Sequence, residues 1–170
     1  MNTIQSGDLP KQALLAKYQA DGAFTDCYFI DFPQAVSHAE FVAAFYTTPL
    51  FKVERCILAL LARKPSSDLD VQRLASGEGN RFAAWQVEDR TPNQLLLCDF
   101  MGRTRSWLMT VAPEGGTPGA TRLFFGSAVI PRRDLASGRV SLGWGFHALL
   151  GFHRAYSRAL LRAACARLSK

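Results

Sequence analysis

Residues 146–168 read FHALLGFHRAYSRALLRAACARL and have the periodicity of a long amphipathic helix. Apolar side chains recur at steps of three and four residues, the spacing of one helix face. The expected stripe consists of Leu149, Phe152, Tyr156, Leu160 and Ala163, and Arg154, Arg158 and Arg162 follow at four-residue steps on another face. Because such a helix is stable mainly through the covering of its apolar stripe, we expect it to pack across a sheet.

The sheet that would cover this helix is predicted upstream of it. Strand-like runs rich in aromatic, β-branched and leucine residues occupy residues 23–33, 81–90, 94–100, 105–114 and 121–131. The last four runs are separated by short segments that contain glycine, proline or asparagine. Short links of this kind favour antiparallel neighbours joined by hairpins, because parallel neighbours need a long crossover.

Two helices are predicted directly after the first strand. Ser37 and Glu40 match the S-x-x-E capping box that begins a helix. Thr48 and Pro49 match the cap and first position of a second helix. The apolar face of that second helix is expected to hold Leu50, Val53, Ile57, Leu60 and Leu61. A further short, capped helix is predicted within residues 66–77.

Together these elements predict an α+β fold. A curved antiparallel sheet of five to seven strands would grip the long C-terminal helix, with two short helices after the first strand. We expect a single domain over residues 23–170 and an N-terminal arm over residues 1–22, with one helical stretch within 10–22. Gly151, inside the long helix, is expected to allow close contact with a bulky sheet residue or a ligand.

The composition is that of a water-soluble globular chain. It has 170 residues, of which 48% are apolar and 20% are charged. The N-terminal residues are polar, and the uncharged run at 140–152 is too short to cross a bilayer. Cys27, Cys56, Cys98 and Cys165 are widely spaced, and no CxxC pair occurs. We therefore expect four buried, reduced thiols in a cytoplasmic protein.

Three motifs resemble a known superfamily. They are DCYFIDFP at 26–33, the pair RSWLMTVAPE and TRLFFGSAVIPR at 105–114 and 121–132, and GFHALLGFHRAYSRALLRA at 145–163. They are similar to the START-like, or SRPBCC, helix-grip superfamily, and more closely to a bacterial family of unknown function. That family occurs alone or behind nicotinamide-binding domains of the short-chain-dehydrogenase type. The resemblance covers roughly residues 24–168 and implies an internal cavity between sheet and helix, with no catalytic residue set.

The leading functional hypothesis is a binding protein for a small apolar or amphipathic ligand. Five aromatic side chains are candidates for the pocket wall, and a filled core remains the alternative for them: Trp85, Trp107, Phe125, Phe152 and Tyr156. A few polar groups orient the ligand in such pockets. Glu54, Asp99 and Arg105 are the candidates here, because each lies in or beside an apolar segment.

A second hypothesis is an acid–base enzyme of the cyclase, dehydratase or hydrolase type that uses the same cavity. Glu54 or Asp99 would act as acid or base, and Arg105 would stabilise developing negative charge. Alternation places Asp99 on one face of its strand, and it would lie beside Trp107 if the corresponding faces of the two strands coincide. A structural ion pair at a hairpin end is the alternative for Asp99.

A third hypothesis is an interaction module that uses the basic C-terminal helix. The formal net charge is +6, and eight basic residues but one acidic residue follow Pro131. Arg154, Arg158 and Arg162 could meet an anionic lipid or an acidic partner, or could form an ordinary solvated face.

Other classes of site receive no support from the sequence. His147 and His153 are six residues apart, so they point to different sides of a helix and are not expected to share a metal. The chain contains no G-x-S-x-G, G-x-G-x-x-G or P-loop motif. We therefore expect no cofactor, no metal and no nucleic-acid partner, and the oligomeric state is left open.

Overall fold

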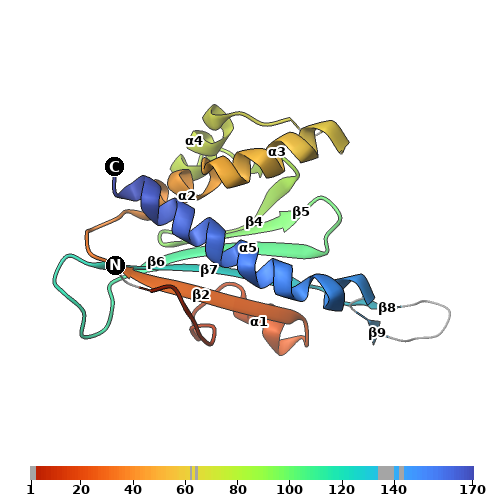
Figure 1. Ribbon diagram of the computed structural model, residues 1–170, viewed down its shortest axis with the longest axis horizontal. Helices are drawn as coiled ribbons and strands as arrows, with labels where there is room; N and C mark the ends of the chain where they lie inside the picture. The colour runs from red at the N-terminus through yellow and green to blue at the C-terminus, as the bar shows by residue number, and fades with distance from the viewer. Residues whose placement is uncertain (1–2, 62, 64, 134–139, 142–143) are drawn as a thin grey trace.

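The computed structural model describes residues 3–61, 63, 65–133, 140–141 and 144–170, and it is built around one antiparallel sheet (Figure 1). Seven strands pair in the order β1-β2-β7-β6-β5-β4-β3, each antiparallel to its neighbour. The strands are β1 (Gln5–Ser6), β2 (Phe24–Phe32), β3 (Arg81–Phe82), β4 (Trp85–Thr91), β5 (Gln94–Asp99), β6 (Thr104–Val111) and β7 (Thr121–Val129).

Helices α2 to α5 lie on one side of this sheet, and α5 runs diagonally across it (Figure 1). The helices are α1 (Ala16–Ala20), α2 (His38–Tyr46), α3 (Pro49–Leu61), α4 (Asp68–Ser76) and α5 (Trp144–Leu168). The predicted α+β fold, with an antiparallel sheet holding a long C-terminal helix, is confirmed. This architecture is compatible with a helix-grip fold.

Two strands were not predicted from the sequence because they are very short. β1 and β3 have two residues each, too few for an alternation of apolar and polar side chains to be visible. They complete the sheet to seven strands at its two edges. A separate two-stranded hairpin joins β8 (Arg132–Arg133) to β9 (Val140–Ser141). Residues 134–139 and 142–143 lie outside the described part of the chain.

The predicted starts of α2 and α3 are confirmed. The Ser37 backbone N–H donates to Glu40 Oε2 at 2.8 Å, and the Glu40 N–H donates to Ser37 Oγ at 3.2 Å, which completes the capping box. The Phe51 N–H donates to Thr48 Oγ1 at 3.1 Å, so Thr48 caps α3. These bonds satisfy backbone donors that have no partner within the helix.

The short helix predicted within residues 66–77 is α4. Ser67 and Asp70 form a second capping box at its start. Its C-cap, Gly77, has φ of 89°, a left-handed conformation that glycine adopts without steric cost.

The sheet has an apolar core on each of its faces. The inner core lies under α2 to α5, and its strand residues are Tyr28, Ile30, Phe32, Phe82, Leu95, Leu97, Leu108, Leu123 and Phe125. The outer core lies on the opposite face and contains Ala13, Leu15, Cys27, Leu96, Trp107, Met109, Phe124 and Ala128. Alternation along each strand explains this division, because successive side chains point to opposite faces.

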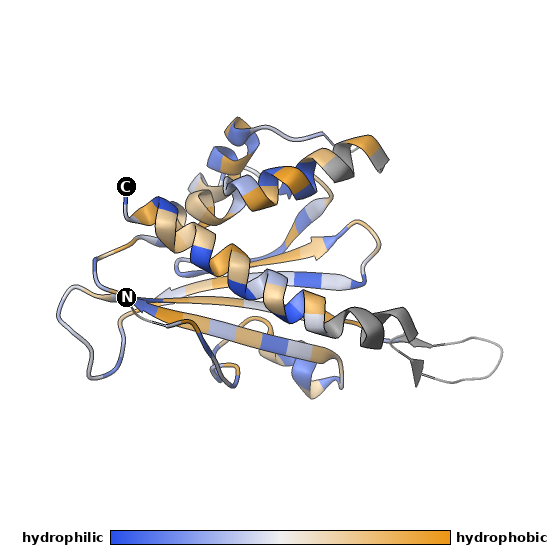
Figure 2. Ribbon diagram, in the orientation of Figure 1, coloured by the Kyte–Doolittle hydropathy of each residue, from blue (hydrophilic) through white to orange (hydrophobic). Residues whose placement is uncertain are grey.

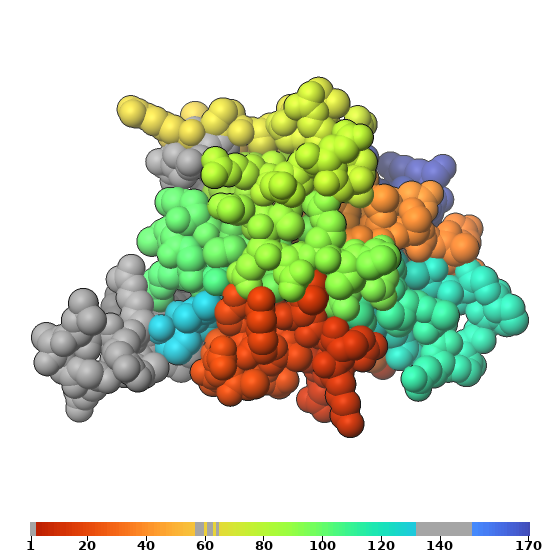
Figure 3. Space-filling view, turned by 180° about the vertical axis from the view of Figure 1, so that it is seen from behind, coloured from red at the N-terminus to blue at the C-terminus, as the bar shows by residue number. Residues whose placement is uncertain are grey.

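The N-terminal arm covers the outer face. Seen from behind, its residues, coloured red, lie at the lower centre of this face (Figure 3). Leu15 is fully buried there, and β1 extends the sheet by pairing with β2. α1 spans Ala16–Ala20, which lies within the predicted stretch 10–22 but is shorter than it, because the residues before α1 turn and lie against the sheet. The arm is therefore part of the packed structure.

Gly126 of β7 makes the close packing of the outer core possible. A Cβ atom at this position would lie 2.7 Å from the Asp26 carbonyl oxygen, 3.0 Å from the Trp107 ring and 3.1 Å from Leu15. The absence of a side chain therefore lets the indole and the arm approach the strand backbone.

The buried side of α5 differs from the predicted stripe. Ser157, Leu161 and Ala164 are buried together with Leu160, whereas Phe152 is 68% exposed. α5 packs against both α2 and β2, so its buried side faces the angle between helix and sheet. Small side chains permit close approach on that side. The prediction that Phe152 grips the sheet is wrong, and the Leu149 side chain lies outside the described part of the chain.

Gly151 does not make the close contact expected of it. It is exposed, and no atom of the described residues lies within 4 Å of the position that its Cβ would occupy. The expectation of a bulky sheet neighbour at this position is therefore wrong, and the alternative of a bound ligand stays a prediction.

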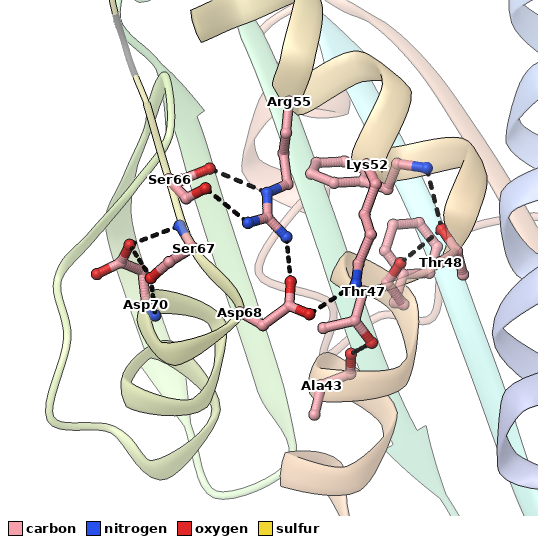
Figure 4. A network of polar contacts seen from close by, with 11 residues as sticks. Ala43, Thr47, Thr48, Lys52, Arg55, Ser66, Ser67, Asp68 and Asp70 are labelled. Carbon is pink, nitrogen blue, oxygen red and sulfur yellow. Dashed lines mark hydrogen bonds and ion pairs between the residues drawn. The ribbon is translucent and has the colours of Figure 1, made fainter.

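α3 turns a different face inward from the one predicted. Val53 is 58% exposed and Leu60 is 75% exposed, whereas Phe51 and Arg55 are buried. Arg55 donates to Asp68 Oδ1 at 2.6 Å and to the Ser66 carbonyl oxygen at 2.6 Å (Figure 4). A buried arginine needs such partners, and here they tie α3 to the start of α4. The side chains of Ile57 and Leu61 lie outside the described residues.

The four cysteines are free and differ in burial. Cys27 is buried, Cys98 and Cys165 are half-buried, and Cys56 is exposed on α3. The prediction of four buried thiols is wrong for Cys56, because it lies on the same outward side of α3 as Val53.

Candidate functional site

A half-buried carboxylate links α3 to α5. The Tyr156 hydroxyl donates to Glu54 Oε2 at 2.6 Å. Burial raises the pKa of Glu54, and the hydrogen bond from Tyr156 opposes part of that rise. Burial also raises the pKa of the Tyr156 phenol, and the Glu54 charge adds to this effect. Glu54 and Tyr156, two predicted site residues, are thus brought into direct contact.

Other polar groups lie on the same side of the sheet. The hydroxyl of Tyr46 is fully buried and lies 3.0 Å from Ser106 Oγ. Trp85 Nε1 and Ser157 Oγ are buried without a hydrogen-bond partner among the described residues. Buried polar atoms are nearly always paired, so two unpaired ones mark this interior as unusual.

Aromatic side chains fill the interior near α2. Phe125 lies with its ring centroid 4.7 Å from that of Phe45, which also contacts Phe41, Tyr46 and Phe51. Phe125 therefore belongs to packed core, the alternative that the sequence left open for it. Trp85 lies at the margin of this core and is half-buried.

Trp107 and Arg105 lie on the opposite face of the sheet. The register pairs Leu96 with Trp107, so Trp107 points outward with Leu96, away from Leu95 and Leu97. The condition under which Asp99 would lie beside Trp107 is therefore not met. Trp107 is fully buried under the arm, and its Nε1 donates to Gln94 Oε1 at 2.9 Å.

Asp99 holds a turn. Its Oδ1 accepts from the backbone N–H of Arg103 at 2.7 Å and from that of Thr104 at 3.1 Å. These bonds fix the hairpin between β5 and β6, which is the type of role expected of an aspartate in a turn. Its partners are backbone amides rather than the arginine side chain anticipated from the sequence.

The acid that pairs with Arg105 is Glu88, which sequence reasoning missed. Arg105 Nε lies 2.6 Å from Glu88 Oε2, and Lys17 Nζ lies 2.8 Å from Glu88 Oε1. The Tyr18 hydroxyl also donates to Glu88. Burial acts to raise the pKa of Glu88, but the hydrogen bonds from Lys17 and Tyr18 outweigh it and leave that pKa lowered. This cluster fastens α1 to the sheet.

No local sequence signal marked Glu88. It lies between two residues, Val87 and Asp89, where the pairing of β4 with β5 shifts register. Such bulges redirect side chains. A bulge is set by cross-strand pairing, so it could not be placed from β4 alone.

A groove lies between the C-terminal half of α5 and the edge of the sheet. Its volume is about 570 Å³. It is lined by Thr3, Ile4, Ile30, Asp31, Phe32, Pro33, Arg162, Cys165, Ala166 and Ser169. Asp31 forms a two-point ion pair with Arg122 at 2.6 and 2.8 Å, and this hydrogen bonding lowers the pKa of Asp31. Arg162 is exposed and forms no ion pair with the described residues.

The groove combines apolar walls with a cation. Isoleucine, phenylalanine and alanine side chains supply the walls, and Arg162 supplies a positive charge. Of its lining residues, Arg162 alone was a candidate from the sequence, because the two walls come from opposite ends of the chain.

A Ser-His-Asp cluster joins α5 to β2 and β7 but lacks the geometry of a catalytic triad. His153 Nε2 lies 2.9 Å from Ser127 Oγ and 3.1 Å from Asp26 Oδ2. In a triad the serine and the aspartate use different ring nitrogens. Here Ser127 Oγ also donates to Asp26 Oδ1 at 2.7 Å, so the three side chains form a polar network that links the helix to the sheet.

Two kinds of feature were not found in the part of the chain that the structure describes. No group of three or more His, Cys, Asp or Glu side chains could hold a metal ion there, and the His147 side chain lies outside that part. None of the described helices is long and apolar enough to cross a membrane.

Comparisons with protein-family models, with curated proteins and with solved structures found no match for this chain. The resemblance to helix-grip proteins therefore rests on architecture: a seven-stranded antiparallel sheet with a C-terminal helix across it.

Proposed function

We propose that the protein binds a small amphipathic ligand with an acidic head group in the groove between α5 and β2. The groove volume of about 570 Å³ carries the proposal, because ligand sites commonly measure roughly 300–1,000 Å³. Apolar walls suit a hydrocarbon body, and the Arg162 guanidinium suits a carboxylate or phosphate head.

Two finer assignments belong to the same proposal. Membership of the START-like superfamily would agree with the sheet and the long helix across it. A cytoplasmic location would agree with four free cysteines, since thiols persist in reducing compartments.

Filling the groove should abolish binding without unfolding the protein. Ala166 lines the groove and is exposed, so Ala166→Trp should place an indole in the ligand's space. We expect the affinity for cis-parinaric acid, a fluorescent fatty acid, to fall about tenfold or more, which corresponds to a loss of about 1.4 kcal/mol. Fluorescence titration measures this change.

Ala155→Trp is the matched control, because Ala155 is an exposed alanine of the same helix that does not line the groove. It should bind like the unchanged protein. Dodecanoate should displace the probe better than dodecanol does, because Arg162 pairs with the charged head alone. Equal affinity in the two tryptophan variants, or no saturable binding by the unchanged protein, would refute the groove as the site.

A second candidate function is acid–base catalysis by Glu54. The observation in its favour is a half-buried carboxyl whose pKa is raised by burial and whose described hydrogen-bond partner is a phenol. Raised carboxyl pKa values suit a general acid at neutral pH. The carboxylate of Asp99, the other candidate acid, already accepts hydrogen bonds from the backbone of the β5–β6 turn.

Glu54→Gln should change the pH dependence of stability. The pKa of Glu54 in the folded protein lies above its ordinary value of 4.5, so folding favours the protonated form. The stabilisation from that form is complete below 4.5 and is lost as pH rises through the folded-state pKa. Because glutamine stays neutral, the variant should become progressively more stable than the unchanged protein across this window.

Urea unfolding at a series of pH values measures the difference in the free energy of unfolding. A difference that stays constant with pH would show that Glu54 is not desolvated, and the catalytic candidate would lose its support.

A further inference from the structure

α3 presents an apolar stripe to solvent. Val53 and Leu60 are 58% and 75% exposed, and Cys56 is exposed between them. Their spacing of three and four residues places them on one side of the helix. They are exposed because α3 is oriented with Arg55 buried, which leaves Val53, Cys56 and Leu60 on the side that faces solvent. Apolar side chains that face solvent contribute little to the stability of the isolated chain, so stability does not explain this stripe.

Phe152 of α5 is a further large apolar side chain exposed to solvent, at 68%. Its ring stacks on Tyr156 with centroids 5.9 Å apart, and Tyr156 bonds to Glu54, the neighbour of Val53 along α3. Figure 1 shows α3 and α5 on the same side of the sheet, and they contact each other. We call Val53, Cys56, Leu60 and Phe152 the apolar ridge. Exposed apolar clusters of this kind mark interaction sites.

An exposed row of arginines follows α5 beside the ridge. Arg154, Arg158 and Arg162 are all exposed, and none forms an ion pair with a described residue. Figure 2 shows apolar and polar residues alternating along both helices on this side. The surface therefore offers apolar anchors and positive charge together.

We propose that the apolar ridge and the arginine row dock the protein on the surface of an anionic lipid bilayer. Phosphate groups complement the arginines, and the large apolar side chains fit below the level of the head groups. A second copy of the chain fits less well, because it would bring a second arginine row toward the first. The two proposals share Arg162, which lines the ligand groove, but Val53, Cys56, Leu60, Phe152, Arg154 and Arg158 do not line it.

Sedimentation with lipid vesicles tests the docking. We expect binding to vesicles of phosphatidylglycerol and phosphatidylcholine at low salt, weaker binding at high salt, and none to phosphatidylcholine alone. Arg154→Gln should weaken binding about fivefold, the effect typical of one basic residue near an anionic surface. Arg81→Gln, an exposed arginine of β3, should change binding little.

Leu60→Asp tests the apolar contribution. We expect it to reduce vesicle binding roughly tenfold or more, because the leucine that would enter the bilayer is lost and the new negative charge repels lipid phosphate. Leu69→Asp is the matched control, since Leu69 is 54% exposed on α4, on the far side of α3 from α5 (Figure 1). Urea unfolding of both variants separates loss of docking from loss of folding.

Cys56 provides a direct report of insertion. It is exposed, whereas burial raises the pKa of Cys27 to about 12 and that of Cys165 to about 11, so a thiol-reactive NBD dye should label Cys56 first. The dye fluorescence should rise and shift to the blue with anionic vesicles. No binding at low salt, or equal binding by Leu60→Asp, would overturn the proposal. So would self-association without lipid that Leu60→Asp abolishes, which would assign the ridge to a second copy.

Discussion

Trp107→Ala is expected to lower the free energy of unfolding by about 3–5 kcal/mol, the range for removal of a buried large aromatic side chain. Trp107 is fully buried in the outer core, where it contacts Phe124 and the arm. The change also removes the indole N–H that donates to Gln94 Oε1. It leaves a cavity that cannot easily collapse, because the strand backbone at Gly126 is already in close contact with its neighbours. Urea unfolding followed by circular dichroism measures the loss.

Two controls separate packing from binding. Trp107→Phe keeps most of the ring but removes the hydrogen bond to Gln94, so it should cost less than the alanine variant. Under conditions where Trp107→Ala stays folded, its affinity for cis-parinaric acid should equal that of the unchanged protein, because Trp107 does not line the groove. A loss of affinity in the folded variant would place the ligand on the outer face.

Leu161→Ala is expected to lower the free energy of unfolding by about 2–5 kcal/mol. Leu161 is fully buried, and with Leu160 and Ala164 it forms the part of α5 that enters the inner core. Truncation would leave space between α5 and the elements that pack against it, and rigid neighbours fill such space poorly.

Phe152→Ala is the contrasting variant, because it removes a larger side chain from an exposed position of the same helix. We expect a change within about 0.5 kcal/mol. Chemical unfolding of both variants therefore tests which side of α5 is buried. A larger loss for Phe152→Ala than for Leu161→Ala would restore the stripe inferred from apolar spacing.

α5 shows why its buried side was misplaced. The spacing rule selects large apolar residues, and Phe152 satisfies it. The true buried side includes Ser157 and Ala164, whose small size permits close approach rather than adding apolar area. A helix packed between another helix and a sheet selects for shape as well as for hydrophobicity.

The buried side of α3 was also misplaced, here because of a polar residue. Arg55 is unfavourable inside a core unless it has partners, and those partners, Ser66 and Asp68, lie beyond the end of α3 (Figure 4). The orientation of α3 thus depends on where α4 begins, so Val53 and Leu60 could not be assigned to solvent from their spacing.

The candidate site was partly predictable. Glu54 was chosen as a charge close to an apolar face, and it is buried against Tyr156, another candidate. Trp107 and Arg105 were assigned to the same pocket but lie on the other face of the sheet. The register pairs Trp107 with Leu96, so Trp107 and Arg105 point away from the face that holds Leu95, Leu97 and Asp99. A shift of one residue moves every side chain of a strand to the opposite face.

The sequence by itself determined the elements and their class. Capping residues, turn residues and the length of apolar runs act over a few neighbouring positions, so they specify the helices, the main strands and the antiparallel α+β arrangement. The tertiary structure alone decided which faces are buried, which acid meets Arg105, and where the groove lies. These depend on contacts between segments up to about the whole chain apart, such as Ile4 beside Cys165, and no local pattern encodes them.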